Sequence, residues 1–292
     1  RAPLGDGFTA HKRLFDDYLP NTLAPLLYEV DGQIKDEVFE YGSFSQSKMY
    51  AKGVRCSDCH NPHSAELKAP GDGVCLQCHN PAGKAANPQV QGAGLLAKDY
   101  ESREHHQHTP GAAGSQCVDC HMPGKLYMGN DYRHDHSFSI PDPERALALG
   151  SRDACLTCHV DTPVKQVVQQ FEQWFPSSAD HDGGYARALQ AIRAGQPGAA
   201  KVLDKQLQRG DLPPIRRATL LAELPAYPSV RNGQVLMLSL KSPSAEVRLA
   251  AVDALPALLP PQQQVEVLGP MLSDSLQAVR MNTAFTLASL PR

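Results

Sequence analysis

The stretch Cys56–His79, CSDCHNPHSAELKAPGDGVCLQCH, contains two Cys-x-x-Cys pairs, each followed directly by a histidine. Two interpretations compete for this pattern. Two Cys-x-x-Cys pairs separated by about 15 to 20 residues have the spacing of a zinc site made of four thiolates. The sequence Cys-x-x-Cys-His is also the attachment sequence of c-type haem. Because the two interpretations predict unrelated proteins, the rest of the chain has to decide between them.

The motif occurs twice more, as CVDCH at Cys117–His121 and as CLTCH at Cys155–His159. Zinc gives no reason for the histidine, since four thiolates already complete a tetrahedral shell. A thioredoxin-like dithiol needs neither four copies nor the histidine. Haem does need it, because this imidazole becomes an axial ligand of the iron. The sequence therefore predicts four haems c.

All 8 cysteines lie in the four pairs, so none is left for a disulfide. The thiols predicted to bind the haems are Cys56, Cys59, Cys75, Cys78, Cys117, Cys120, Cys155 and Cys158. The predicted proximal ligands are His60, His79, His121 and His159.

Composition argues against a nucleic-acid-binding or membrane-spanning protein. The 292 residues carry a formal net charge of -3, so no strongly basic face is expected. No run of 18 or more apolar residues is present. The chain starts at Arg1 and shows no signal peptide, and covalent haem attachment takes place outside the cytoplasm. We therefore expect a processed or truncated precursor, located in the periplasm or outside the cell.

A change in composition predicts two domains, at residues 1–163 and 164–292. The first part is rich in Gly, Pro, Asn and His, and its short turns and helices are expected to wrap the haems. An exception is Leu26–Phe44, where Asp31-Gly32 between two alternating runs predicts a β-hairpin. We expect a loop-rich, mainly α tetrahaem cytochrome c domain with this one small hairpin.

Residues 164–292 predict an all-α domain that begins with a helix in DTPVKQVVQQFEQWF, at Asp161–Phe175. A β-branched residue followed by Arg then recurs in steps of 32 residues, each time before an apolar run and Leu-Pro. We expect helix pairs that bury their apolar faces against one another, as in a HEAT-like solenoid. The arginines are expected to make structural contacts between units. The recurring pairs are Ile215-Arg216, Val247-Arg248 and Val279-Arg280.

Eight histidines outside the motifs determine what the haems can do. An iron with two imidazole ligands has no open position, so it transfers electrons and binds no substrate. His63 follows the first proximal histidine by three residues, and we expect it to reach the haem on Cys75 and Cys78. The other candidate ligands are His136 in RHDHSF, His106 and His108 in the HHQH cluster, and His11.

The HHQH cluster, His105–His108, is expected to supply one or two ligands, and the sequence leaves open which. His134 and His181 are expected to be solvated or to contact propionates. Methionine can also be the second ligand of a haem iron. Met122 follows a proximal histidine directly and cannot fold back over the same iron. Met49 and Met128 are possible ligands, but histidines are plentiful and packing is the expected role of these two residues.

Four stretches resemble bacterial multihaem c-type cytochromes that carry a helical-repeat tail. They are YGSFSQSKMYAKGVRCSDCHNPHS (41–64), EHHQHTPGAAGSQCVDCHMP (104–123), DHSFSIPDP (135–143) and ACLTCH (154–159). The resemblance is specific in the motif-containing part and generic in the repeats. It implies electron transfer, and it implies further CxxCH motifs before this region. Related proteins include nitrite- and hydroxylamine-converting enzymes.

Three functions follow as hypotheses. The first is an electron carrier with four bis-His haems, whose repeat domain docks a redox partner or a neighbouring haem-bearing subunit. The second is a nitrite- or hydroxylamine-type reductase, which needs one haem with an open position. The third is a filament-forming extracellular cytochrome that assembles with copies of itself.

Overall fold

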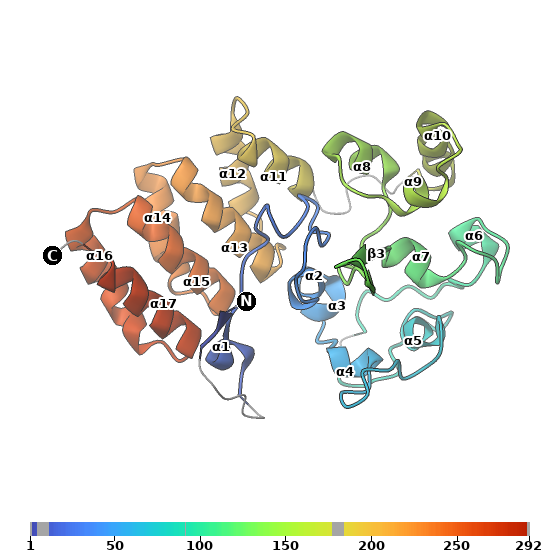
Figure 1. Cartoon of the computed structure of the whole chain (residues 1–292), viewed down its shortest axis with the longest axis horizontal. Coiled ribbons are helices and arrows are strands. Elements are labelled where there is room, and N and C mark those ends of the chain that lie inside the picture. Colours follow the sequence, from blue (N-terminus) through green and yellow to red (C-terminus); the bar gives the residue numbers. More distant parts are fainter. Residues whose placement is uncertain (1, 5–11, 91, 177–183, 291–292) are drawn as a thin grey trace. The chain divides into compact units, whose positions relative to one another are not determined.

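The computed structural model describes residues 2–4, 12–90, 92–176 and 184–290. Within these residues the chain is mainly helical, with two small antiparallel sheets (Figure 1). It divides into two compact units. Residues 29–184 form what we call the motif unit, and residues 1–28 together with 185–292 form the helical unit.

The motif unit consists of short elements joined by long loops, as expected for its Gly- and Pro-rich sequence. Its elements are α2 (Tyr41–Phe44), α3 (Lys48–Ala51), α4 (Cys56–Cys59), α5 (Gly73–Leu76), α6 (Arg103–His106), α7 (Cys117–His121), β3 (Gly124–Tyr127), β4 (Asp131–His134), α8 (Pro143–Leu149), α9 (Ala154–Cys158) and α10 (Val164–Trp174).

The helical unit contains the longer helices that the Ala- and Leu-rich sequence predicts. Its elements are β1 (Ala2–Pro3), α1 (Leu14–Asp17), β2 (Tyr18–Leu19), α11 (Tyr185–Arg193), α12 (Ala199–Leu207), α13 (Pro214–Glu223), η1 (Leu224–Ala226), α14 (Val230–Ser239), α15 (Ala245–Ala254), η2 (Leu255–Ala257), α16 (Pro261–Leu268), η3 (Gly269–Ser273) and α17 (Gln277–Ala288).

The division into two units differs from the one that the sequence predicts, which lies between residues 163 and 164. The helix predicted at Asp161–Phe175 is confirmed as α10, but α10 belongs to the motif unit. The N-terminal segment belongs to the helical unit, where the Leu23 amide donates to Thr219 Oγ1 at 3.0 Å. Arg193 Nη2 donates to the Leu23 carbonyl at 2.7 Å. A change in composition therefore marks where the motifs end, not where the packing changes.

The helical unit contains a continuous apolar core. Helix α13 packs against α15, and α15 packs against α17. The β-branched residues of the 32-residue pattern, Ile215, Val247 and Val279, lie in these three helices and are at most 3% exposed. The pattern thus identifies one buried position in each helix.

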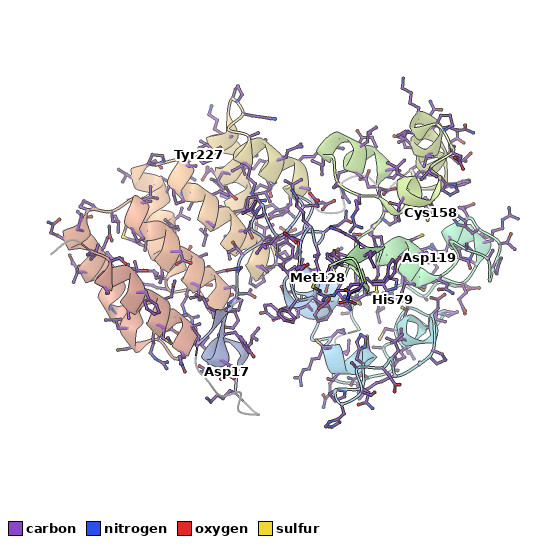
Figure 2. All side chains as sticks on the ribbon, in the orientation of Figure 1. Asp17, His79, Asp119, Met128, Cys158 and Tyr227 are labelled. Carbon is purple, nitrogen blue, oxygen red and sulfur yellow. The ribbon has the colours of Figure 1, made fainter. Side chains whose placement is uncertain are left out.

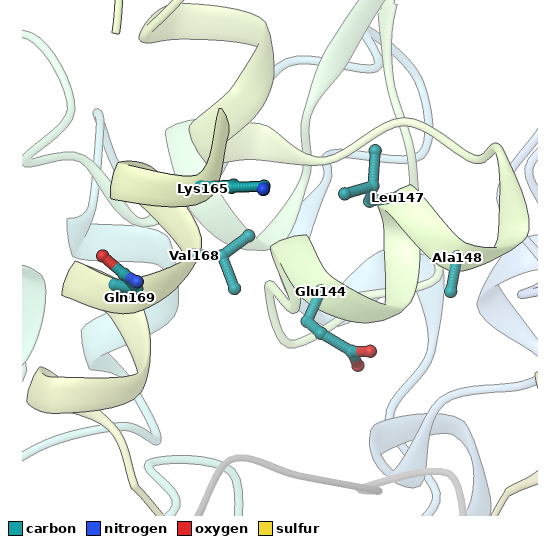
Figure 3. Close-up of a pocket in the computed structure, with 6 residues that line it drawn as sticks. All are labelled: Glu144, Leu147, Ala148, Lys165, Val168 and Gln169. Carbon is teal, nitrogen blue, oxygen red and sulfur yellow. The ribbon is translucent and has the colours of Figure 1, made fainter. Parts of the chain in front are cut away.

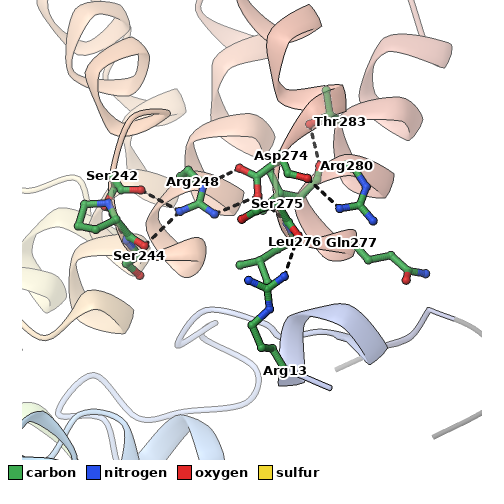
Figure 4. A network of polar contacts seen from close by, with 12 residues as sticks. Arg13, Ser242, Ser244, Arg248, Asp274, Ser275, Leu276, Gln277, Arg280 and Thr283 are labelled. Atoms are coloured by element: carbon green, nitrogen blue, oxygen red, sulfur yellow. Dashed lines mark hydrogen bonds and ion pairs between the residues drawn. The ribbon is translucent and has the colours of Figure 1, made fainter. Parts of the chain in front are cut away.

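The arginines of the same pattern make structural contacts, as the sequence predicts. Arg248 forms two hydrogen bonds with the Asp274 carboxylate, at 2.7 and 3.0 Å, and Arg280 donates to the Asp274 carbonyl (Figure 4). Arg216 lies over the Tyr185 ring, 4.6 Å from its centre. Arg248 therefore ties α15 to the loop that precedes α17.

The hairpin predicted over Leu26–Phe44 is wrong in its position. A turn does form at Asp31-Gly32, where the Glu29 carbonyl accepts from the Gly32 amide, but the chain then enters helix α2. Gly32 has φ +94°, and a Cβ there would overlap the Gln46 side chain, whose amide donates to the Gly32 carbonyl. A backbone bond from the Glu29 amide to the Gln33 carbonyl at 2.8 Å and these side-chain contacts hold the turn, but the predicted strands do not form on either side of it.

The hairpin of the motif unit is instead β3–β4, with Gly124 opposite His134 and Tyr127 opposite Asp131. It directly follows the third motif. Asp135, just after β4 and 2% exposed, accepts from the Ile34 amide at 2.6 Å and the Ser137 amide at 2.7 Å. The hairpin is thus anchored to the start of the motif unit.

Every helix in the described part of the chain is too short or too polar to cross a lipid bilayer.

Candidate haem site

Each Cys-x-x-Cys pair lies on or beside one short turn of helix, in α4, α5, α7 and α9. Residues three apart on a helix share a face, so both thiols of a pair lie on the same side. The amide of the following histidine donates to the carbonyl of the first cysteine, at 2.8 Å for His60, 3.0 Å for His79 and 2.8 Å for His159. The motif sequence thus produces the same local structure repeatedly.

Aspartates fix the starts of three of these turns. Asp58 and Asp119, inside their motifs, accept from the amides of Arg55 at 2.7 Å and Gln116 at 3.3 Å. Asp153, just before α9, accepts from the first amides of that helix. These carboxylates satisfy amide groups that lack a partner inside so short a helix.

Consecutive motifs lie next to one another in chain order. Burial, followed by the charge of Cys75, raises the pKa of Cys59. The thiols of Cys75 and Cys117 hydrogen-bond to each other, which lowers the pKa of Cys75 and raises that of Cys117. Burial raises the pKa of Cys120 to about 11, and the charge of Cys158 acts in the same direction. The first motif thus neighbours the second, the second the third, and the third the fourth, in helices α4, α5, α7 and α9 (Figure 1). Figure 2 labels one residue of each of the last three motifs, His79, Asp119 and Cys158.

All eight cysteines are free thiols that are exposed or half-buried. Within the described ranges, no group of three or more His, Cys, Asp or Glu side chains is arranged to hold a single metal ion. The arrangement that does occur is a pairing of imidazoles.

Three of the four motif histidines have a second histidine ring nearby, at nearly the same distance between ring centres. A metal–imidazole bond of about 2 Å, plus about 1 Å from the bonded nitrogen to the ring centre, places two opposed rings roughly 6 Å apart. The observed pairs are His60 with His136 at 6.3 Å, His121 with His105 at 6.1 Å, and His159 with His108 at 6.0 Å. The residues present therefore fit an iron between each pair.

Most of these rings are oriented by a backbone carbonyl at Nδ1, which leaves Nε2 available to a metal. The Nδ1 contacts are His60 with Ala65 O at 2.8 Å, His136 with His134 O at 2.9 Å, His121 with Ser139 O at 3.0 Å, and His108 with His106 O at 2.5 Å. The sequence gives no signal for these carbonyl partners, because they depend on the loops.

Glycine at position 114 leaves room for one of the rings. Gly114 has φ +84°, and a Cβ there would lie 2.8 Å from Nε2 of His108. Any larger residue would press against this imidazole. The backbone thus provides space on the side where His108 carries its free nitrogen.

His106 differs from its two neighbours in the HHQH cluster. Its Nε2 bonds to the Glu101 carbonyl at 3.0 Å, and its Nδ1 accepts from the His108 amide at 3.1 Å. The His106 and His108 rings are 6.4 Å apart, but this distance follows from the tight turn at Gln107, which has φ +62°. With both nitrogens engaged, His106 supports the turn.

His105, in contrast, faces the third motif from helix α6. Its Nδ1 lies 3.2 Å from the ammonium of Lys98. Burial, followed by the charge of Lys98, lowers the pKa of His105 to about 4, so the ring is neutral. Neutral imidazole is the form that binds a metal. Sequence reasoning did not single out His105, because the pattern HHQH does not show where the helix ends.

Burial also lowers the pKa of His79, His121 and His136. These rings are therefore mostly neutral at about pH 6.5, where an unperturbed histidine is half protonated. His79 packs edge to face with Tyr100, with ring centres 5.6 Å apart.

The remaining predicted histidines occupy different surroundings. His63 is exposed in the loop between the first two motifs, and its amide donates to Asn61 Oδ1 at 2.9 Å. His134, expected to be solvated or near a propionate, is half-buried with Nδ1 2.7 Å from the Met122 carbonyl. His11 and His181 lie outside the described residues.

A pocket of about 300 Å³ lies between α8 and α10 (Figure 3). Its six lining residues include neither a cysteine nor a histidine. They are Glu144, Leu147, Ala148, Lys165, Val168 and Gln169. This pocket is separate from the thiols and imidazoles of the motifs.

Comparison with known proteins matches residues 48–84 to the family model described as a doubled CXXCH motif. The crystal structure of the outer cell wall cytochrome OcwA is similar to this chain, with 18% sequence identity and a TM-score of 0.42. The match covers 87% of this chain and 58% of the OcwA chain. No curated protein matches the chain. The doubled motif supports the interpretation of the chain as a multihaem c-type cytochrome.

Proposed function

We propose that the chain transfers electrons along four covalently attached haems c. The observation that carries this proposal is the set of opposed imidazole pairs at 6.0 to 6.3 Å, each containing one motif histidine. A haem iron held between two imidazoles supplies one-electron transfer without an open position for substrate.

The pairs support one choice of axial ligands, which we propose. His136 is the second ligand opposite His60, His105 is the second ligand opposite His121, and His108 is the second ligand opposite His159. Two of these assignments involve one turn of the chain. His105 lies in α6 and His108 lies two residues after this helix, and they pair with the histidines of the third and fourth motifs. His106 then orients this turn and is not a ligand.

For the haem on Cys75 and Cys78 we retain His63 as the second ligand opposite His79. Two observations support this assignment. The loop that carries His63 joins the first motif to the second, and Cys59 of the first motif lies within electrostatic reach of Cys75. The exposed imidazole of His63 is free of the carbonyl contact that fixes His60.

The chain's own residues determine the order of the haem sites. Thiol neighbours link each motif to the next, so an electron can pass from the first attachment site to the fourth in chain order. Nδ1 contacts hold the imidazoles in fixed orientations, which limits the reorganisation that each transfer requires.

The proposal places the chain in the periplasm or outside the cell, because covalent haem attachment takes place there. It also assigns the HEAT-like helical unit to docking a redox partner or a neighbouring subunit. Exposed apolar side chains of α14, α16 and α17 support this role; among them are Leu238, Val265 and Phe285, which are 69%, 56% and 66% exposed.

Intact mass measured under denaturing conditions tests the attachment. The wild-type chain should carry four haem masses. Cys75→Ala/Cys78→Ala should carry three, because the second motif then has no thiol to bond its haem, whereas Ser57→Ala, inside the first motif, should keep all four. A wild-type mass without haem, or a Cys75→Ala/Cys78→Ala mass with four haems, would overturn the proposal.

A further inference from the structure

Four polar side-chain atoms of the motif unit are buried and have no hydrogen-bond partner within the described residues. They are Gln33 Oε1, Ser137 Oγ, Ser151 Oγ and Arg152 Nη2. A buried polar group without a partner lowers stability, and a charged group does so most. Arg152 is the charged member of this set, because a guanidinium stays protonated in proteins. Its Nη2 therefore has the strongest need of a partner.

Hydrogen bonds join most of these residues into one network. Gln33 Nε2 donates to the Arg152 carbonyl at 2.7 Å. The amide of Ile34, which follows Gln33, donates to Asp135 Oδ2 at 2.6 Å, and the Ser137 amide donates to Asp135 Oδ1 at 2.7 Å. Three of the four atoms thus lie in one connected part of the motif unit, and the fourth belongs to the residue before Arg152.

Within the described residues, no carboxylate of the chain neutralises Arg152 by direct contact. Asp135 and Asp153 are 2% and 5% exposed, and both oxygens of each carboxylate accept backbone amides. None of the ion pairs in this part of the chain includes Arg152. The polypeptide thus supplies neither a hydrogen bond at Nη2 nor a counter-charge, and a carboxylate from another source would provide both.

We propose that Arg152 Nη2 binds a carboxylate and that this carboxylate is a haem propionate. Hydrogen bonds between a guanidinium and a carboxylate are charge-assisted, so they are shorter and stronger than neutral ones. The hydroxyls of Ser137 and Ser151 can also donate. Gln33 Oε1 only accepts hydrogen bonds and is not part of the proposed contact. The inference rests on the proposed function, because it requires haem attached to the motifs.

The position of Arg152 in the chain indicates which haem supplies the propionate. Arg152 lies three residues before Cys155 of the fourth motif. In haem c the propionates lie on the side of the macrocycle opposite the thioether bonds, so the haem of the fourth motif directs its propionates away from Arg152. Ser137, in contrast, directly follows His136, the proposed second ligand of the first haem. The propionate is therefore assigned to the haem of the first motif.

Resonance Raman spectroscopy of the full haem-loaded chain tests this contact, because the propionate bending band responds to hydrogen bonds at the propionates. Arg152→Gln should shift part of this band relative to wild type. Arg152→Lys keeps the charge but loses the planar fork of donors, so it should give a smaller shift. Lys165→Gln, the control, removes an exposed lysine of α10 and should leave the band in place.

Potentiometric titration at about pH 8, where a free carboxyl stays ionised, gives a second readout. One midpoint should fall in Arg152→Gln, because loss of a positive charge favours ferric iron. The expected change is on the order of fivefold in the redox equilibrium constant, which is roughly 40 mV for one electron. Lys165→Gln should leave all midpoints in place.

Two further measurements identify the carboxylate. In a chain with Cys56→Ala/Cys59→Ala, which lacks the first haem, Arg152→Gln should no longer alter the band, and a shift that persists would contradict the assignment to that haem. Adding acetate should leave the wild-type band and midpoints as they are. A midpoint that depends on acetate would make the occupant a dissolved carboxylate and overturn the inference.

An unmoved propionate band in both Arg152 variants would also overturn the inference, even with a lowered midpoint. Nη2 would then be satisfied by a buried water, and the guanidinium would act on the iron only through its charge. A chain without covalent haem would overturn the proposed function itself, whereas four haems with an unmoved band would remove this inference alone.

Discussion

Two observations together select the proposed ligands: a carbonyl at Nδ1, which leaves Nε2 for a metal, and a second histidine ring at 6.0 to 6.3 Å. His60, His121, His136 and His108 show both. His134 shows only the first, because its Nδ1 lies 2.7 Å from the Met122 carbonyl while its ring packs on Tyr132. His106 uses both nitrogens within its own turn. The number of histidines therefore exceeds the number of proposed ligands, and we base the choice among them on these contacts.

The HHQH cluster provides a comparison of three adjacent imidazoles. His105→Ala and His108→Ala should each open one iron, because each removes a proposed ligand. His106→Ala, the matched control, should open none and should only loosen the turn. Carbon monoxide binding to the reduced protein measures this: about one equivalent for each of the first two variants and close to none for the third.

The opposite pattern would contradict the assignment. Carbon monoxide binding in His106→Ala, with none in His105→Ala, would make His106 the ligand and His105 the support.

The motif residues could be recognised in the sequence because the four copies share one spacing, and haem attachment at all four of them stays a prediction. The second ligands stay a proposal. The sequence named His136 and His108 and left open which histidines of the HHQH cluster serve; the position of His105 depends on the end of α6, where Gln107 adopts a left-handed conformation. His63 and its partner iron stay a prediction.

At the scale of elements, short helices carry the site and polar side chains join them. Asp72, before α5, accepts from the Cys117 amide of α7 at 2.9 Å, so the second motif helps to position the third. The sequence predicted a hairpin in this part of the chain but at the wrong place. The alternation around Asp31-Gly32 was correct for a turn, yet side-chain amides bond this turn: Gln33 Nε2 donates to the Asp31 carboxylate and Gln46 Nε2 donates to the Gly32 carbonyl.

In the helical unit, Asp274 is the acceptor of the Arg248 ion pair, and both side chains are about nine-tenths buried. Asp274→Asn should destabilise the unit by about 1 to 3 kcal/mol, because a buried guanidinium loses its charged partner. Asp211→Asn, which alters the exposed pair with Arg209, should cost less than about 1 kcal/mol. Urea unfolding followed by circular dichroism compares the two, and equal effects would show that burial of the pair has no consequence.

The same ion pair predicts a pH dependence. Burial opposes ionisation of Asp274, but hydrogen bonds from Arg248 and from the Leu276 amide outweigh it and lower the pKa of the carboxyl. A lowered folded pKa gives stability that is present above the unfolded value, about 3.9, and is lost as pH falls through the folded pKa. The stability difference between wild type and Asp274→Asn should therefore be full at pH 7 and shrink below about pH 4.

At the scale of the whole molecule, the two units differ in how their buried apolar side chains are distributed. The extended cluster of buried apolar side chains comes from the helical unit, between residues 185 and 279. Buried apolar residues of the motif unit, such as Ile34, Phe44 and Phe171, are scattered among loops. The proposed haems would complete this second core. Composition could predict two regions, but the return of the N-terminal segment to the helical unit depends on Leu23 and Thr219 and carries no sequence signal.

Hydrogen exchange of a full-length chain with all eight cysteines changed to serine tests the role of haem in folding. Amides of α11 to α17 should remain protected, because their apolar core is independent of haem. Amides of α4 to α9 should exchange much faster than in the haem-loaded protein, which is the control. Equal protection of both units without haem would mean that the motif unit folds on its own packing.

Low-temperature electron paramagnetic resonance of the oxidised, haem-loaded chain tests the central claim most directly. The account predicts low-spin ferric signals for the haems held by His60 with His136, His121 with His105, and His159 with His108, and for the haem proposed to lie between His79 and His63. A high-spin signal that accounts for two or more haems per chain would contradict the paired ligation on which the electron-transfer proposal depends.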